Sequence, residues 1–125
     1  TTAMLTTFNE ADMSEVIKLR EQYKEAFIAR YKTKLGFMSF FVKACVSALQ
    51  AYPQVNSYLD GDDQVFRAGI DIGVAVSSER GLIVPVLKHA DHLTFAQIEQ
   101  QIDEYALKAK TGALLLDDLT GGGFT

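Results

Sequence analysis

The sequence is short of cysteine, of basic charge and of long apolar runs, and each shortage excludes a class of protein. Cys45 is the single cysteine among 125 residues, which rules out an intramolecular disulfide and fits a reducing compartment. The formal net charge is −4, which argues against nucleic acid as a partner because phosphate binding needs clustered Lys and Arg. No apolar run approaches the roughly 20 residues that span a bilayer, so no membrane partner is expected.

The composition that is present is that of a soluble globular protein. Hydrophobic residues make up 48% of the chain and charged residues 22%, close to the averages for such proteins. A chain of 125 residues is one domain or part of one, and it is long enough to bury a core. The N-terminal residues lack the basic and apolar regions of a signal peptide.

Two amphipathic helices are predicted, one near each end of the chain. The first follows a predicted strand from Ala3 to Asp12 and begins with a capping-box-like pattern, Asp12 followed three residues later by Glu15. Its apolar stripe has helical spacing and consists of Val16, Leu19, Tyr23, Phe27 and Tyr31. The second begins at Thr94, with Gln97 completing a capping box, and ends at Gly112. Its stripe consists of Phe95, Ile98, Ile102, Tyr105 and Ala109.

A third helix is predicted from Phe37 to Ala51, where nearly every residue is apolar. A helix of this composition is expected to be buried on most sides. Pro53 ends it, because proline disfavours helical geometry at the residue before it. The thin polar stripe of this helix consists of Ser39, Lys43, Ser47 and Gln50.

A hairpin is predicted after this helix. Val55 to Leu59 and Gln64 to Arg67 are short strand-like runs, and the turn between them contains Asp60, Gly61, Asp62 and Asp63. Gly and Asp are the residues that tight hairpin turns favour. The three aspartates do not have the spacing of a twelve-residue calcium loop with a closing Glu, so a hairpin tip explains them better.

Two further strands are predicted from Ile70 to Val76 and from Leu82 to Leu87, with turn residues Ser77 to Gly81 between them. Their nearly continuous apolar character suits strands that are covered on both faces. Pro85 cannot donate a ladder hydrogen bond, so a bulge or an edge position is expected there. A short turn or helix over 114–119 and the glycines Gly121 to Gly123 then lead into what we expect to be one more strand.

Few residues of the sequence are candidates for catalysis, metal binding or phosphate binding. Cys45 lies in the most apolar helix, so we interpret it as a core residue and not as a nucleophile. His89 and His92, with Asp91 between them, are too few for a stable zinc site, and we interpret them as part of a solvated connection. The three glycines from Gly121 are followed by Phe-Thr and lack the Lys-Ser or Lys-Thr of a P-loop. The residues alone therefore indicate an α/β domain with no self-contained active site.

Six stretches in order resemble the acyltransferase core components of 2-oxo acid dehydrogenase complexes. Their sequences are AMLTTFNE (3–10), KLGFMSF (34–40), YPQVN (52–56), DIGVAV (71–76), RGLIVPV (80–86) and DDLTGGGFT (117–125). The first two are most similar to the succinyltransferase of the 2-oxoglutarate dehydrogenase complex. The resemblance covers essentially the whole chain and corresponds to the N-terminal half of the family's catalytic domain.

The resemblance implies a chloramphenicol-acetyltransferase-like α/β fold, an α+β sandwich that is incomplete here because the C-terminal half is missing. It implies transfer of a succinyl group from dihydrolipoyllysine to coenzyme A, a step of the tricarboxylic acid cycle. A histidine of an H-x-x-x-D-G motif is the family's general base, and a hydroxyl from the adjoining subunit stabilises the oxyanion. Trimers that build cages and the other subunits of the complex are the implied partners. The implied location is the cytoplasm of a bacterium or the mitochondrial matrix of a eukaryote.

The H-x-x-x-D-G motif does not occur in these 125 residues, so none of the family's catalytic residues is assigned here. The resemblance implies that the catalytic histidine, its aspartate and the oxyanion-stabilising hydroxyl all lie beyond Thr125. We therefore expect residues 1–125 to be a truncated catalytic domain without the lipoyl and peripheral-subunit-binding domains, and to be inactive by themselves. The alternative is a non-catalytic assembly module that self-associates through uncovered apolar surface.

No metal is expected, because the two histidines lack a sufficient ligand set. No cofactor bound by this chain is expected either: the resemblance implies that the parent enzyme uses a covalently attached lipoyl group and takes coenzyme A as a substrate. Ser77, Arg80 and Gly81 are retained as candidate substrate contacts. The family places the loop that holds them close to its core, and the Arg80 charge could meet an acidic succinyl or phosphate group. An ordinary exposed turn is the competing interpretation, since a lone arginine is usually only solvated.

Overall fold

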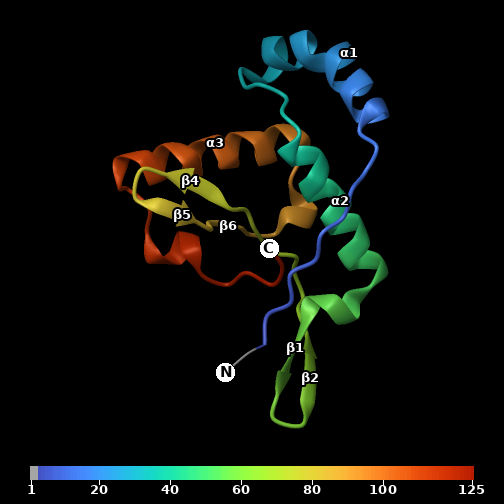
Figure 1. Cartoon of the computed structure of the whole chain (residues 1–125), viewed down its shortest axis with the longest axis vertical. Coiled ribbons are helices and arrows are strands. Elements are labelled where there is room, and N and C mark those ends of the chain that lie inside the picture. Colours follow the sequence, from blue (N-terminus) through green and yellow to red (C-terminus); the bar gives the residue numbers. More distant parts are fainter. Residues whose placement is uncertain (1–2) are drawn as a thin grey trace.

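A computed structural model of the whole chain describes residues 3–125 and shows mixed helices and short strands (Figure 1). The elements in order are α1 (Ser14–Tyr31), α2 (Met38–Ala51), η1 (Pro53–Asn56), β1 (Ser57–Asp60), β2 (Asp63–Phe66), β3 (Ile72–Gly73), β4 (Val76–Ser78), β5 (Gly81–Ile83), β6 (Val86–Leu87), η2 (Ala90–His92), α3 (Phe95–Thr111) and η3 (Leu116–Leu119). Helix α1 lies at one end of the long axis and the β1–β2 hairpin at the other. Within residues 3–125, no helix has the length and apolar character needed to cross a membrane.

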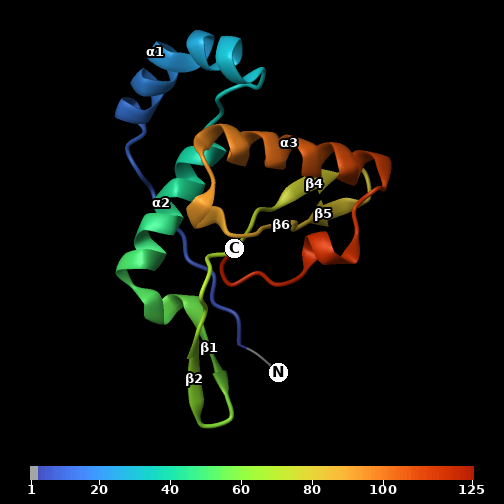
Figure 2. The same ribbon diagram turned by 180° about the vertical axis from the view of Figure 1, so that it is seen from behind.

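The core lies where α2 and α3 meet the β3–β6 strand pair. Its buried members are Val42, Val46, Leu49, Ile70, Ile72, Val74, Leu87, Ala90 and Ile98. The view from behind shows α3 running alongside the β4–β5 pair, with α2 crossing near its N-terminal end (Figure 2). The core is therefore built from segments far apart in the sequence, and it lies on one side of each helix.

Helix α3 confirms its predicted boundaries. The Thr94 hydroxyl accepts a hydrogen bond from the Gln97 N–H at 3.1 Å, and the Gln97 side chain accepts one from the Thr94 N–H at 2.9 Å. This reciprocal capping box satisfies two donors that the first turn of a helix leaves without partners. Gly112 ends the helix at φ +73°, a left-handed conformation that favours glycine.

Helix α2 has the predicted extent, but the prediction that it is buried on most sides is wrong. Its buried residues form one face, whereas Met38 and Phe41 are exposed. The reason is that α3 and η2 pack against only part of its circumference in the described chain. Ser39, predicted to lie on a polar stripe, is fully buried because α3 packs against this part of α2, and its backbone N–H donates to the Glu99 carboxylate of α3.

The two predicted central strands are each broken into two short strands. Strands β3 and β6 pair antiparallel, and so do β4 and β5, so the run 70–76 and the run 82–87 each contribute to both pairs. Pro85 lies at the second break, where it has no N–H to donate but its carbonyl accepts a bond from the Val74 N–H at 3.0 Å. These strands are covered on both faces only at β3 and β6, because β4 and β5 are partly exposed.

The β1–β2 hairpin confirms the predicted hairpin, with Asp60 paired to Asp63 across the turn. The predicted first strand began too early, because Val55 and Asn56 belong to the 3-10 helix η1. Gly61 has φ +61°, the conformation for which such a turn needs glycine. At the end of the chain, Phe124 forms a parallel bridge to Ile72, and the Gly73 N–H donates to its carbonyl at 2.8 Å. The glycine-rich segment before it therefore leads into a strand-like contact, as predicted.

The predicted strand at 3–12 is wrong. These residues are extended and exposed, with Met4, Leu5 and Phe8 exposed by 85%, 89% and 89%. No strand of the described chain lies beside them, so the ladder that would define a strand is absent. Asp12 begins α1 by accepting a bond from the Ser14 N–H at 3.0 Å, without forming the predicted capping box.

Candidate functional site

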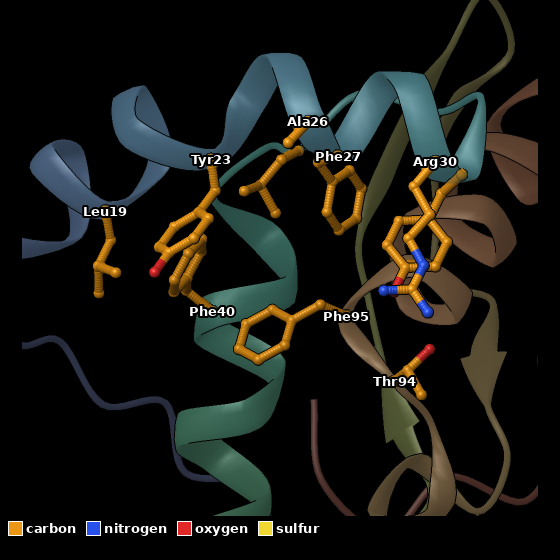
Figure 3. Close-up of a pocket in the computed structure, with 11 residues that line it drawn as sticks. Leu19, Tyr23, Ala26, Phe27, Arg30, Phe40, Thr94 and Phe95 are labelled. Atoms are coloured by element: carbon orange, nitrogen blue, oxygen red, sulfur yellow. The ribbon is translucent and has the colours of Figure 1, made fainter.

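A hollow lies between α1 and the N-terminal ends of α2 and α3 (Figure 3). It measures about 540 Å³, within the range of small-molecule pockets. The predicted apolar stripe of α1 supplies one wall. The lining consists of Leu19, Tyr23, Ala26, Phe27, Arg30, Tyr31, Leu35, Phe40, Thr94, Phe95 and Ala96.

Polar groups are few in this hollow. The Arg30 guanidinium lies 5.2 Å from the centre of the Tyr31 ring, at the end of the hollow where Thr94 also lies, and Leu19 marks the opposite end. The Thr94 hydroxyl accepts the capping bond of α3. Among the described residues, no histidine, cysteine or carboxylate lines the hollow, so its lining offers apolar contact and one positive charge, without a general base or a nucleophile.

The candidate contacts Ser77, Arg80 and Gly81 lie at the β4–β5 hairpin. Ser77 belongs to β4 and pairs with Leu82, Arg80 lies in the turn, and Gly81 begins β5 at φ +113°. All three residues are exposed and none lines the hollow. Arg80 lies near the C-terminal end of α3, whereas the hollow lies at the N-terminal end of that helix. The structure therefore groups the three residues at one turn and separates them from the hollow beneath α1.

Thr125 is the residue beyond which the family's catalytic groups are expected. It is exposed and directly follows the Phe124 bridge to Ile72. Its hydroxyl lies close to β3, where a Cβ atom added at Gly73 would be 3.0 Å from the Thr125 Oγ1. In the described chain, none of the candidate contacts Ser77, Arg80 and Gly81 lies at this position. The location of the catalytic groups beyond Thr125 stays a prediction.

The two histidines lie in the connection between β6 and α3. Their ring centres are 6.3 Å apart, and the His92 Nε2 lies 3.4 Å from an Asp91 carboxylate oxygen. His89 has φ +51°, and its N–H donates to the Asp71 carboxylate at 2.8 Å. Residues 3–125 bring no group of three His, Cys, Asp or Glu side chains together in a way that would hold a metal ion.

Cys45 is partly buried and packs against the core. Burial raises the pKa of its thiol, because a thiolate is poorly solvated in apolar surroundings. The predicted packing of Cys45 against the core is confirmed, although its side chain is only partly buried. Asp60 and Asp63 lie at the hairpin tip, where turn chemistry explains them.

A buried carboxylate that the sequence did not reveal is Glu99 of α3, which is only 8% exposed. It accepts hydrogen bonds from the Gly36 N–H at 3.1 Å and from the Ser39 N–H at 3.0 Å. It thus caps the N-terminus of α2 from a helix some sixty residues later in the chain. Its spacing in α3 places it one residue after Ile98, beside the apolar stripe, which is the only sequence signal for its burial.

Comparison with known proteins gives consistent matches along the whole chain. A family model described as 2-oxoacid dehydrogenases acyltransferase (catalytic domain) matches residues 1–125. The dihydrolipoyllysine-residue succinyltransferase component of the 2-oxoglutarate dehydrogenase complex from Rickettsia typhi is 55% identical over 125 residues, and that from Escherichia coli K12 is 54% identical over 124. The succinyltransferase component of the mitochondrial 2-oxoglutarate dehydrogenase complex 1 of Arabidopsis thaliana is 51% identical over 125 residues. The matches cover 99–100% of this chain but only 31%, 31% and 27% of those relatives.

Solved structures agree with the fold. A probable dihydrolipoamide acetyltransferase from Listeria monocytogenes superposes with a TM-score of 0.84 at 36% identity, covering 91% of this chain and 49% of that chain. The cubic core of the pyruvate dehydrogenase multienzyme complex superposes with a TM-score of 0.83 at 30% identity, covering 90% and 46%. The predicted α/β acyltransferase-core fold is therefore confirmed, and the described residues correspond to about half of each solved chain.

Proposed function

Because this chain belongs to the acyltransferase catalytic-domain family of the 2-oxoacid dehydrogenases, we propose that it serves in succinyl transfer within a 2-oxoglutarate dehydrogenase complex. The observation that carries the proposal is the identity of 51–55% to succinyltransferase components along the chain. The acetyltransferase structures share the fold at lower identity, 30–36%. The chain spans about 31% of the Rickettsia relative, so the reaction is assigned to the longer protein of which such a segment is part.

In the proposed reaction, the coenzyme A thiol attacks the carbonyl carbon of the succinyl thioester on dihydrolipoyllysine. A new C–S bond forms to coenzyme A, the C–S bond to dihydrolipoyl breaks, and the thiol proton ends on the dihydrolipoyl sulfur. The step needs a base near the attacking thiol and donors around the developing oxyanion. The contribution of residues 3–125 is the scaffold around the α2–α3 core.

We propose that the 125-residue chain by itself does not catalyse this reaction. Its two histidines lie in the β6–α3 connection, and the sequence up to Thr125 contains no H-x-x-x-D-G motif. The test mixes the purified chain with succinyl-dihydrolipoamide and coenzyme A and follows the release of dihydrolipoamide thiol. Release at the uncatalysed rate is expected, and turnover above that rate would overturn this part of the proposal.

Arg80 is the charged member of the proposed substrate contacts Ser77, Arg80 and Gly81. Its guanidinium is exposed at the β4–β5 turn, where it is free to meet the carboxylate of a succinyl group or a phosphate of coenzyme A. The Arg80→Ala change, made in the full-length enzyme that contains this chain, should weaken coenzyme A binding. Unchanged binding would remove Arg80 from the site and leave an ordinary exposed turn.

The second proposed function is self-association. Large apolar side chains are exposed on the N-terminal segment, on the β1–β2 hairpin and on η3, including Phe8, Leu59 and Leu116, and such surface favours association. One solved relative of the fold is the cubic core of a multienzyme complex, which favours an oligomer of this chain and partners within the 2-oxoglutarate dehydrogenase complex. Sedimentation should reveal oligomers, and a monomer at high concentration would contradict this proposal.

The proposed location follows the sources of the relatives. They come from bacteria and from plant mitochondria, so we place the protein in the cytoplasm of a bacterium or in the mitochondrial matrix of a eukaryote. Fractionation of the source cells with an antibody to the chain would test this placement.

A further inference from the structure

Helix α1 is held to the rest of the molecule chiefly through the residues that follow it. No residue of α1 is buried, and no other helix or strand of the described chain runs closely along it. Figure 1 shows it standing apart from α3 and joined to α2 by a short connection. We call this connection, residues 32–37, the connecting segment. The position of α1 over the hollow therefore depends on what fixes the connecting segment.

Helix α1 and the connecting segment are tied to each other. The Arg20 side chain donates a hydrogen bond from Nε to the Leu35 carbonyl at 2.7 Å. Its guanidinium also lies 5.1 Å from the centre of the Phe37 ring, within the range of a cation–π contact. These contacts make α1 and the connecting segment one unit, so a movement of the segment would carry α1 with it.

Besides the buried side chain of Leu35, which is 5% exposed, hydrogen bonds to three side chains of α3 hold this unit to the body. The Thr33 hydroxyl donates to the Asp103 carboxylate at 3.2 Å, and the Gln100 amide donates to the Tyr31 carbonyl at 3.3 Å. Both of these bonds are exposed, and exposed polar contacts contribute little because water competes for the same groups. The third side chain, Glu99, is buried and forms two bonds with the segment and the start of α2.

Glu99 is suited to dominate the polar part of this attachment. Its two carboxylate oxygens accept separately from the Gly36 and Ser39 N–H groups, at the positive end of the α2 dipole. A Cβ atom at Gly36 would lie 3.0 Å from one of these oxygens, so a glycine permits the close approach. Hydrogen bonds to a buried charge are stronger than neutral exposed ones.

We propose that Glu99 is a carboxylate clamp and that α1 with the connecting segment opens from the body as one local unit when the clamp is lost. Local units of this kind open without global unfolding, and hydrogen exchange measures their opening. Opening would widen the hollow, because α1 supplies one wall of it. The clamp thereby controls access to the apolar lining under α1.

The test measures backbone hydrogen exchange in the 125-residue chain and in the Glu99→Ala variant. Residues 14–37 and the Ser39 amide should exchange together, roughly tenfold to a hundredfold faster than in the unchanged chain, the effect expected from losing charge-assisted bonds. The centre of α3 and the C-terminal half of α2 should keep their protection. The matched control is Glu104→Ala, which removes an exposed carboxylate of the same helix that pairs with Lys108, and it should leave α1 unchanged.

Two further variants keep the test decisive if Glu99→Ala does not fold. Glu99→Gln retains one acceptor oxygen, so its exchange in α1 should lie between those of the unchanged chain and the alanine variant. Gly36→Ala should accelerate the exchange of the same amides. The double variant Gly36→Ala with Glu99→Gln should accelerate exchange by less than the product of the two single factors, because both changes disturb one contact. Exchange in α1 that matches the Glu104→Ala control, or that rises by one factor along the entire chain, would overturn the clamp.

Discussion

The packing of α3 against the core can be tested at Ile98 by measuring how much its truncation lowers the free energy of unfolding. Its side chain is fully buried among the core residues of α2 and the β3–β6 pair. Replacing Ile98 with alanine removes buried methyl groups and leaves a cavity, which costs about 3 kcal/mol within a usual range of roughly 2–5. With a urea m-value of about 1.5 kcal/mol per molar, the unfolding midpoint should fall by about 2 M. Leu107 is on the same helix but 62% exposed, so Leu107→Ala should change the stability by no more than about 0.5 kcal/mol.

The assay is urea unfolding followed by far-UV circular dichroism for the unchanged chain and both variants. A domain of this size has a total stability of about 5–15 kcal/mol, so Ile98→Ala should still fold if the chain is in the upper part of that range. Ile98→Val, with an expected cost of about 1 kcal/mol, carries the test if alanine is not tolerated. Equal midpoint shifts for Ile98→Ala and Leu107→Ala would refute the assignment of Ile98 to a packed core.

Three further predictions follow from caps and pKa shifts. Thr94→Ala removes half of the α3 capping box and should cost about 1 kcal/mol, a loss of roughly 4 °C in Tm by calorimetry; an unchanged Tm would contradict the cap. The backbone bond from Ser14 lowers the pKa of the Asp12 carboxyl below 3.8, so its stabilisation of α1 is present above that pH and disappears as the pH falls through the lower folded pKa. Asp12→Asn should abolish this loss of helix content at acid pH, measured by circular dichroism as the pH is lowered. Identical curves for the two chains would argue against a role of the Asp12 carboxylate. Burial raises the pKa of the Cys45 thiol, so a disulfide reagent should react more slowly with the native chain than in urea, and equal rates would disprove the burial.

The features that could be predicted from the sequence are those that local chemistry determines. The Thr94 and Gln97 pair and Gly112 define α3 within its own residues, and the aspartates around Gly61 define the β1–β2 turn. In both places the residues that form the feature are close in sequence. The resemblance carried by the six stretches supplied the fold, which the solved structures confirm.

The features that could not be predicted depend on contacts between distant segments. A strand exists only beside a partner, and residues 3–12 have none in the described chain, although the run from Leu5 to Phe8 has the composition of a strand. The buried Ser39 donates its backbone N–H to Glu99, which lies 60 residues later, and no local pattern indicates that pairing. The hollow beneath α1 likewise depends on where the connecting segment places that helix, so its lining became apparent only in three dimensions.

The central claim is that this chain serves in succinyl transfer as part of a longer protein. Its most direct test places this chain in an active relative, in place of the matching segment. The 124 matching residues of the Escherichia coli succinyltransferase component would be replaced by their counterparts from this chain. The purified chimera would then be assayed with succinyl-dihydrolipoamide and coenzyme A, beside the unchanged enzyme and a version that lacks the segment. The account predicts that the chimera assembles and transfers succinyl groups while the version without the segment does not. A chimera that folds and assembles like the unchanged enzyme but releases thiol only at the uncatalysed rate would contradict it.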